Sequence, residues 1–223
     1  MTTIELLPYI AEANPHITAF TCHHYPRQMM VQNQFDEWTE AEQQMFDFAV
    51  QMREQYHLPF WDGIMLSSFD NPQFSERVIM QALRHNPVPE LITLSVSNLS
   101  SLGHMPLDNF ALCSKVILSD VGSLHLPMLD FHISASKVNS LVAADVCGIL
   151  GLGHGWLISS GESYHFIGSK PMLWEELQIK LLQAMLFTPI IDKAWLSHQL
   201  REQCCSLRIG LKNGIMPKVY KEL

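Results

Sequence analysis

The fold of this chain is indicated most clearly by residues 159–167, SSGESYHFI. Apolar residues on both sides of a short segment of Ser and Gly predict two strands joined by a tight turn. Gly161 lets a ligand approach the backbone, and Ser160 and Ser163 carry hydroxyl groups that can donate to phosphate oxygens. His165 can do the same if its other ring nitrogen is held. A plain hairpin with a structural histidine would show the same pattern, so the segment predicts a hairpin and leaves its role open.

The residues around this hairpin predict a layer of strands and helices. Phe110 to Leu118 has the pattern of a strand, and so has Met128 to Ile133. A helix is expected over residues 137–150, and Pro171 should open a second helix. The residues expected to face a sheet from the first of these helices are Val138, Val142, Val146 and Ile149. With a last strand over Ser206 to Ile209, the order strand, helix, hairpin, helix, strand is typical of an RRM-like layer.

The first half of the chain also alternates strand and helix patterns. Strands are expected at Ile17 to Cys22, Gly63 to Ser67 and Leu91 to Val96. Thr39 and Glu42 form a capping box ahead of one helix, and a second helix is expected over about residues 75–85. Asn98 to Asp108, rich in Ser, Gly, Pro and Asn, is expected to be a loop between two lobes. We therefore predict an α/β (α+β) fold.

The composition is that of one globular domain. With 48% hydrophobic and 16% charged residues, the 223 residues can bury a substantial core. We expect a single domain over residues 1–223, with lobes of roughly 1–108 and 109–223. No apolar run approaches the roughly 18 to 20 residues of a membrane span, which predicts a cytoplasmic protein without membrane contact. The five cysteines show no C-x-x-C spacing and are expected to be reduced core residues.

The formal net charge is −8, whereas a protein that holds nucleic acid by its phosphates usually presents a basic surface. Tight, non-specific duplex binding is therefore disfavoured, although a local basic groove is compatible with this charge. Any attraction to a polyanion should be weak and lost with added salt.

Acidic residues interrupt two apolar segments. In Leu129 to Ile133, period-two alternation puts Asp130 and His132 on the same face of a strand, where they could share one cation. The wet face of a half-buried strand would show the same alternation. Asp192 follows Pro189, Ile190 and Ile191. It could be a metal ligand at a strand end, or the N-cap of the helix that follows.

Cationic residues mark a further segment, residues 206–214. Arg208 could clamp a phosphate with two hydrogen bonds, and Lys212, flanked by Gly210 and Gly214, could add a point charge. A surface strand with two cations is the alternative.

In this order the four segments resemble the motifs of the archaeo-eukaryotic primase superfamily. Its catalytic lobe carries an Asp-x-Asp/Glu strand, a hairpin like Ser-Gly-x-x-x-His, a hydrophobic-Asp strand end, and a Leu-Arg-Ile/Leu strand followed by a Gly-containing loop. The corresponding segments here are residues 129–132, 160–165, 190–192 and 207–212. The resemblance covers roughly the C-terminal hundred residues, and it implies a primase-like fold.

The resemblance also implies roles for these residues. Asp130 and Asp192 would bind divalent metal. The hairpin and the basic strand would hold a nucleoside triphosphate through the residues Ser160, Gly161, Ser163, His165, Arg208 and Lys212. In such enzymes two metals activate a 3′-hydroxyl for attack on an α-phosphate and stabilise the leaving oxygens.

This chain departs from the pattern at His132, where the family has a second acid. A neutral imidazole is a poor ligand for Mg²⁺, so a site of Asp130, His132 and Asp192 would favour Mn²⁺. We therefore predict a primase-like nucleotide- or nucleic-acid-binding protein of DNA replication or repair that is catalytically degenerate. Its expected ligands are a nucleoside triphosphate and, weakly, single-stranded or primer-template nucleic acid. The alternatives are a Mn²⁺-dependent nucleotidyltransferase (primase-polymerase) and a metal-dependent phosphohydrolase that uses Asp130, His132 and His165.

Overall fold

The chain forms two compact units. A computed structural model describes residues 1–26, 37–56, 58–83, 88–99, 108–120, 122–212 and 214–223. The first unit comprises Met1–Gln28 and Pro89–Leu223, and the second comprises Met29–Val88. Most of the loop expected at Asn98 to Asp108 lies outside the described residues. The expected lobes of residues 1–108 and 109–223 stay a prediction.

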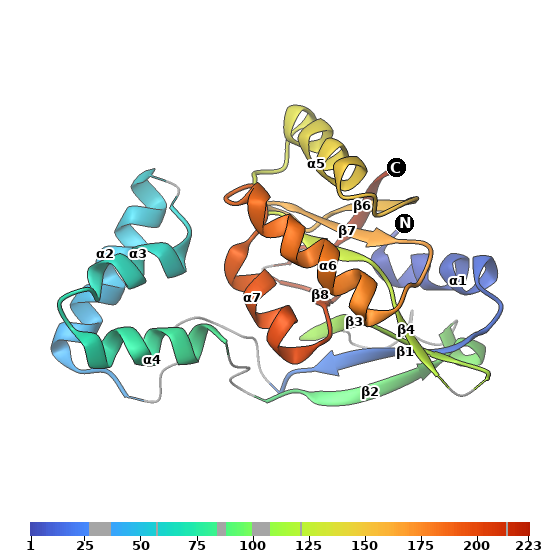
Figure 1. Cartoon of the computed structure of the whole chain (residues 1–223), viewed down its shortest axis with the longest axis horizontal. Helices are drawn as coiled ribbons and strands as arrows, with labels where there is room; N and C mark the ends of the chain where they lie inside the picture. The colour runs from blue at the N-terminus through green and yellow to red at the C-terminus, as the bar shows by residue number, and fades with distance from the viewer. Residues whose placement is uncertain (27–36, 57, 84–87, 100–107, 121, 213) are drawn as a thin grey trace. The chain divides into compact units, whose positions relative to one another are not determined.

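The first unit contains an antiparallel sheet with the strand order β2-β1-β3-β4, in which β8 also pairs with β3 (Figure 1). The bounds of its strands are β1 Ile17–His24, β2 Glu90–Ser95, β3 Phe110–Leu118, β4 Ser123–His125 and β8 Ser206–Arg208. The strands expected at 17–22, 91–96 and 110–118 are therefore confirmed within two residues at each end. Because β1 pairs with β3 of the second half, this sheet joins the two halves of the sequence.

A second antiparallel sheet of the same unit has the strand order β5-β7-β6-β9. Its strands are β5 Met128–Asp130, β6 Gly155–Ser159, β7 Tyr164–Gly168 and β9 Lys218–Glu222. The expected hairpin is confirmed as β6 and β7. The strand expected at 206–209 as the last of this layer is β8, which pairs in the first sheet, and the fourth strand here is β9.

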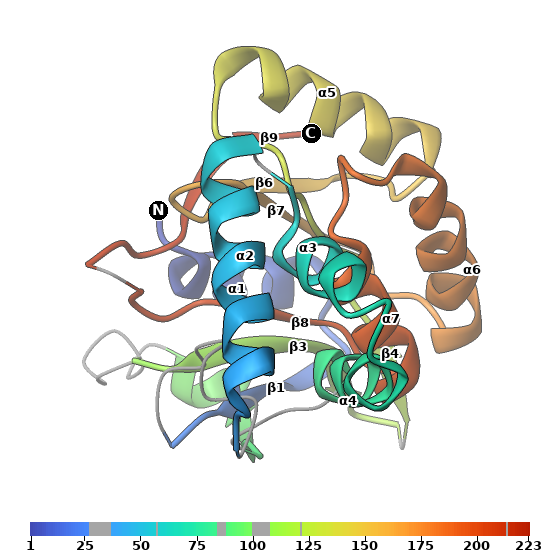
Figure 2. The ribbon, with the colours of Figure 1, turned by 90° about the vertical axis from the view of Figure 1, so that its left-hand side faces the viewer.

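Four helices pack on these sheets: α1 Thr3–Ala13, α5 Lys137–Ile149, α6 Trp174–Ala184, which continues into the short 3-10 helix η3 Met185–Phe187, and α7 Lys193–Glu202. Figures 1 and 2 show α5 over the four-stranded sheet and α1 on the side of that sheet that faces the first sheet. Side chains of α1, of both sheets and of α5, α6 and α7 form one continuous buried core. This core fixes the strand ends that carry the predicted site residues.

Helix α5 confirms its expected bounds but presents a different face to the sheet. Val138 and Ile149, expected to face inward, are 70% and 71% exposed, whereas Ala143 and Cys147 are buried with Val146. The small side chains of Ser140 and Ala143 let the helix lie close to β6 and β7, and Val138 and Ile149 are left outside. Helix α6 begins at Trp174 and not at Pro171, and it buries Leu177, Leu181 and Ala184.

The second unit is a small helical cluster of α2 Glu40–Tyr56, α3 Phe60–Ser67 and α4 Pro72–Ala82. The capping box is confirmed, because Thr39 N–H donates to the Glu42 carboxylate at 2.9 Å and Glu42 N–H donates to the Thr39 hydroxyl at 3.3 Å. The strand expected at Gly63 to Ser67 is wrong, since these residues belong to α3. A short apolar run does not distinguish a strand from a buried helix, and here Ile64 and Gly63 pack on α2.

Two antiparallel sheets with segregated helices make this an α+β fold, as the sequence predicted. Within the residues that the structure describes, no helix is both long and apolar enough to cross a membrane.

Gly155 is the position at which the second sheet should tolerate a side chain least. A Cβ added there would lie 2.5 Å from the Ile167 carbonyl oxygen and 2.7 Å from Gly168 Cα, both of which belong to backbone. We predict that Gly155→Ala lowers the free energy of unfolding by about 1–3 kcal/mol, because backbone must move to admit the methyl group.

Gly148→Ala is the matched control. This glycine is exposed on α5 and has open space around it, so alanine should raise stability by roughly 0.5–1 kcal/mol through its helix propensity. Urea unfolding of both variants measures the two effects. Equal stabilities for both variants would show that the close packing of β6 against β7 at Gly155 is absent in solution.

Candidate functional site

The hairpin turn between β6 and β7 is held by its own serines. The Ser160 hydroxyl lies 3.1 Å from the Ser163 carbonyl oxygen and 3.0 Å from the Ser163 hydroxyl, and Ser160 N–H donates to that carbonyl at 3.0 Å. Gly161 takes the left-handed backbone angle φ +113°, which favours glycine. A Cβ added at Gly161 would lie 3.1 Å from Ile215 Cγ2. The Ile215 side chain therefore lies beside the backbone of Gly161, where the sequence predicted the approach of a ligand. The hydrogen bonds of Ser160 and Ser163 therefore stabilise the turn itself.

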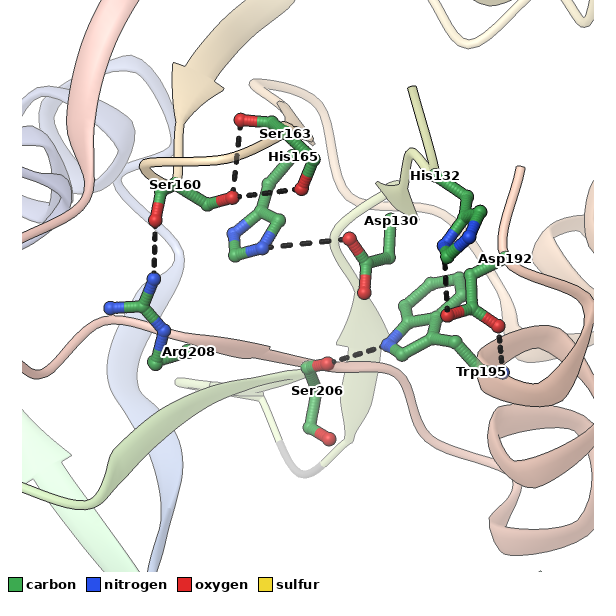
Figure 3. Close-up of polar contacts among 9 residues, drawn as sticks. All are labelled: Asp130, His132, Ser160, Ser163, His165, Asp192, Trp195, Ser206 and Arg208. Carbon is green, nitrogen blue, oxygen red and sulfur yellow. Dashed lines mark hydrogen bonds and ion pairs between the residues drawn. The ribbon is translucent and has the colours of Figure 1, made fainter. Parts of the chain in front are cut away.

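Strand register brings His165, Asp130 and Asp192 into one row (Figure 3). Asp130 and His165 are paired residues of β5 and β7, with 3.6 Å between His165 Nε2 and Asp130 Oδ1. On the other side of β5, an isolated bridge joins Phe131 to Ile191, and Asp192 N–H donates to the Asp130 carbonyl at 3.1 Å. Three segments far apart in the sequence thus present one imidazole and two carboxyl groups side by side.

The two carboxylate oxygens of Asp192 have different partners. Its Oδ1 accepts hydrogen bonds from Ala194 N–H at 2.9 Å and Trp195 N–H at 3.0 Å, which makes it the N-cap of α7. Its Oδ2 lies 3.9 Å from His132 Nδ1, and both side chains are about 30% exposed. The N-cap alternative is therefore confirmed, and one oxygen remains directed toward His132.

Arg208 is bound to backbone on two sides. Its Nη1 donates to the Gly210 carbonyl at 2.7 Å and to the Ile215 carbonyl at 3.1 Å, and its Nη2 donates to the Ser160 carbonyl. The guanidinium group thus joins the hairpin turn to the backbone of Gly210 and Ile215. The Lys212 side chain is exposed, and the backbone of Lys212 pairs with that of Ile215.

A link that the sequence did not reveal comes from Trp195. Its indole N–H donates to the Ser206 carbonyl at 2.9 Å, so it ties α7, which begins behind Asp192, to β8, which carries Arg208 (Figure 3). The only sequence signal was the position of Trp195 three residues after an N-cap.

Burial and charge shift the pKa values of this row. The pKa of Asp130 is raised well above its ordinary value because protein surrounds the carboxyl group and because the Asp192 carboxylate repels its charge, while Lys212 and Arg208 act in the opposite direction. Burial, together with the charges of Arg208 and Lys212, lowers the pKa of His165 to about 3. His165 is therefore neutral at physiological pH and can donate one hydrogen bond and accept another.

The positions of Asp130, His132 and Asp192 bear on their predicted role as metal ligands. In the described parts of the chain, no group of three or more His, Cys, Asp and Glu side chains is arranged to hold a metal ion. Asp192 commits one oxygen to the helix, and the Nδ1 atom of His132 lies 3.9 Å from its other oxygen. As they lie, Asp130, His132 and Asp192 do not fit a preformed three-ligand centre, and their joint ligation of a cation stays a prediction.

Comparison with known proteins gives one match. The family model described as archaeo-eukaryotic primase 1D-like matches residues 92–221, which is more than half of the chain and includes every residue of the candidate site. No curated protein and no solved structure matches the chain.

The low pKa of His165 gives a prediction for the pH dependence of stability. Between about pH 3 and the ordinary value of 6.5, the unfolded chain binds a proton that the folded chain excludes. The free energy of unfolding should therefore fall as the pH falls below 6.5, by up to about 1.4 kcal/mol per pH unit from this one group. His165→Gln removes this titrating group, so the free energy of unfolding of the variant should fall less steeply with falling pH than that of the wild type.

Urea unfolding from about pH 7 to about pH 4, with a chelator present, measures both slopes. His16→Gln is the control, because it removes an imidazole that is exposed in the folded chain. Parallel curves for the wild type and His165→Gln would mean that His165 titrates in water and is not buried beside Arg208.

Proposed function

We propose, because this chain belongs to the archaeo-eukaryotic primase 1D-like family, that it is a primase-like protein that binds a nucleoside triphosphate, or nucleic acid, and does not polymerise nucleotides. Family membership makes it a primase-like, nucleic-acid-related protein. The proposal goes further on one observation: the cationic side chains of Arg208 and Lys212 lie at and beside the hairpin turn, where their charges act on the buried His165.

The cations beside the turn support phosphate binding. Arg208 has five N–H donors, and its three hydrogen bonds to carbonyl oxygens leave two for a ligand. Lys212 is exposed, and its charge acts on both Asp130 and His165. Two cations at one place make a locally positive surface in a chain whose formal net charge is −8.

The buried His165 suits a binding role. A neutral imidazole contributes a directed hydrogen bond without needing to be charged, and β7 holds it in register with Asp130. Arg208 fixes the turn through the Ser160 carbonyl, so the groups around the turn are ordered before any ligand arrives. Such preorganisation lowers the entropy cost of binding.

The acidic row supports the absence of polymerase activity. His132 takes the place of the second acid in the family pattern, and Asp192 spends one oxygen on capping α7. The raised pKa of Asp130 further reduces the negative charge available to two hard cations.

Calorimetry with a nucleoside triphosphate tests the proposed ligand. We expect the wild type to bind, and we expect Lys212→Gln and His165→Ala to bind about tenfold more weakly, because each loses one hydrogen bond to a charged oxygen. Lys170→Gln is the control, since it removes the same charge from an exposed residue beyond the other end of β7. No binding by the wild type, or equal binding by all variants, would refute these contacts.

A Mn²⁺-dependent nucleotidyltransferase is the second candidate function, and one observation favours it. Asp130 and Asp192 lie close enough for the Asp192 charge to raise the pKa of Asp130, and a bound cation would relieve this repulsion. Asp130, Asp192 and His132 would be its ligands.

Replacing His132 separates the two candidates. His132→Asp adds a third carboxylate, and we expect it to raise the affinity for Mn²⁺ by about tenfold or more, whereas His16→Asp adds the same charge at an exposed position and should not. Calorimetry with Mn²⁺ alone gives the affinities, and primer extension gives the activity. Brisk extension by the wild type with Mg²⁺ alone would overturn the proposal that the site is degenerate.

A further inference from the structure

A second cluster of reactive side chains lies where β3 meets the connection between α7 and β8. Cys204 follows α7, and its Sγ lies 3.6 Å from the Ser114 hydroxyl. That hydroxyl is 2.9 Å from His125 Nδ1 and accepts a hydrogen bond from Cys205 N–H at 2.9 Å. Cys113, the residue before Ser114, pairs in register with Ser206, two residues after Cys204. Two thiols, a hydroxyl and an imidazole are therefore neighbours, although they come from three segments.

The two thiols differ in their access to water. Cys113 is fully buried, as is Ser114, and His125 is 6% exposed. Cys204 is only half-buried, whereas the other four cysteines are buried. The residue Cys204 thus has more contact with water than Cys113 has.

The surroundings also favour the thiolate form of Cys204. Its pKa is lowered because the Cys113 thiol, and after it His125 and the Ser114 hydroxyl, form hydrogen bonds to it, although burial acts in the opposite direction. The same contact, with burial, raises the pKa of Cys113. The imidazole of His23 on β1 also faces Cys204. The accessible thiol is therefore the nucleophilic one, because the thiolate is the reactive form of cysteine.

We propose that Cys204 is an oxidation site for peroxide and that Cys113 resolves it to a disulfide. The Cys204 thiolate attacks one peroxide oxygen, the O–O bond breaks, and Cys204 becomes a sulfenic acid while the released hydroxide takes up a proton. The Cys113 sulfur then attacks the sulfenic sulfur, the S–O bond breaks, and the hydroxyl leaves as water with the Cys113 proton. The two thiols lose two electrons, which reduce one peroxide to two molecules of water.

The disulfide would link the connection between α7 and β8, which contains Cys204, to β3, which contains Cys113. Helix α7 begins behind Asp192 and ends at Glu202, and β8 carries Arg208. A bond between Cys113 and Cys204 would fasten the short connection between α7 and β8 to β3. This inference concerns the thiols alone and does not depend on the proposed nucleotide binding.

Mass spectrometry of the wild type tests the pair without any substitution. Reduced, folded protein is exposed to hydrogen peroxide, the remaining thiols are alkylated in denaturant, and the digest is mapped. We expect a Cys113–Cys204 cross-linked peptide that has lost two hydrogens. We also expect Cys204 to be oxidised at least about tenfold faster than Cys147, whose pKa burial raises to about 12. The same treatment of unfolded protein should abolish this preference.

Cys113→Ala separates the two steps. Without the resolving thiol, oxidation should stop at a Cys204 sulfenic acid, which a dione reagent traps. A cross-link that joins other cysteines, or oxidation of Cys204 at the rate of Cys147, would overturn the proposal. If this variant fails to fold, the peptide map of the oxidised wild type still shows whether Cys113 and Cys204 are cross-linked.

Discussion

The candidate site depends on one constraint, the antiparallel register of β5 with its two neighbours. Pairing of Asp130 with His165 on one side, and the bridge between Phe131 and Ile191 on the other, leaves a single arrangement in which His165, Asp130 and Asp192 share a row. A slip of one residue would turn Asp130 into the core and expose Leu129, which is 1% exposed. The buried core on which β5 rests therefore also fixes the polar row.

Burial of the row of Asp130, Asp192 and His165 is unfavourable, and the positive charges of Arg208 and Lys212 offset part of the repulsion between the two acids. Asp130 and Asp192 repel one another, and His165 is buried in a neutral form. Arg208 contributes positive charge while its hydrogen bonds go to the carbonyl oxygens of Ser160, Gly210 and Ile215, so a single side chain both offsets the charge of the acids and holds the hairpin turn. Trp195 extends this arrangement by binding α7 to β8.

Helix α7 lies between the acidic row and the cluster of thiols. One end of α7 is capped by Asp192 in the acidic row, and the other end leads to the thiol cluster of Cys204, Cys113 and Ser114. Strand β8, which follows Cys204 in the chain, pairs with β3. Both features lie within residues 92–221, the segment that the family model matches.

The sequence by itself determined the features that depend on neighbours along the chain. The capping box at Thr39 and the β6–β7 hairpin are local patterns of this kind. Only the tertiary structure decided that residues 63–67 are helical and that β8 pairs with β3. It alone also showed that Arg208 binds the carbonyl oxygen of the distant residue Ser160. Short apolar runs suit a helix and a strand equally well, so the choice between them falls to contacts between distant segments, and these depend on packing that no local pattern records.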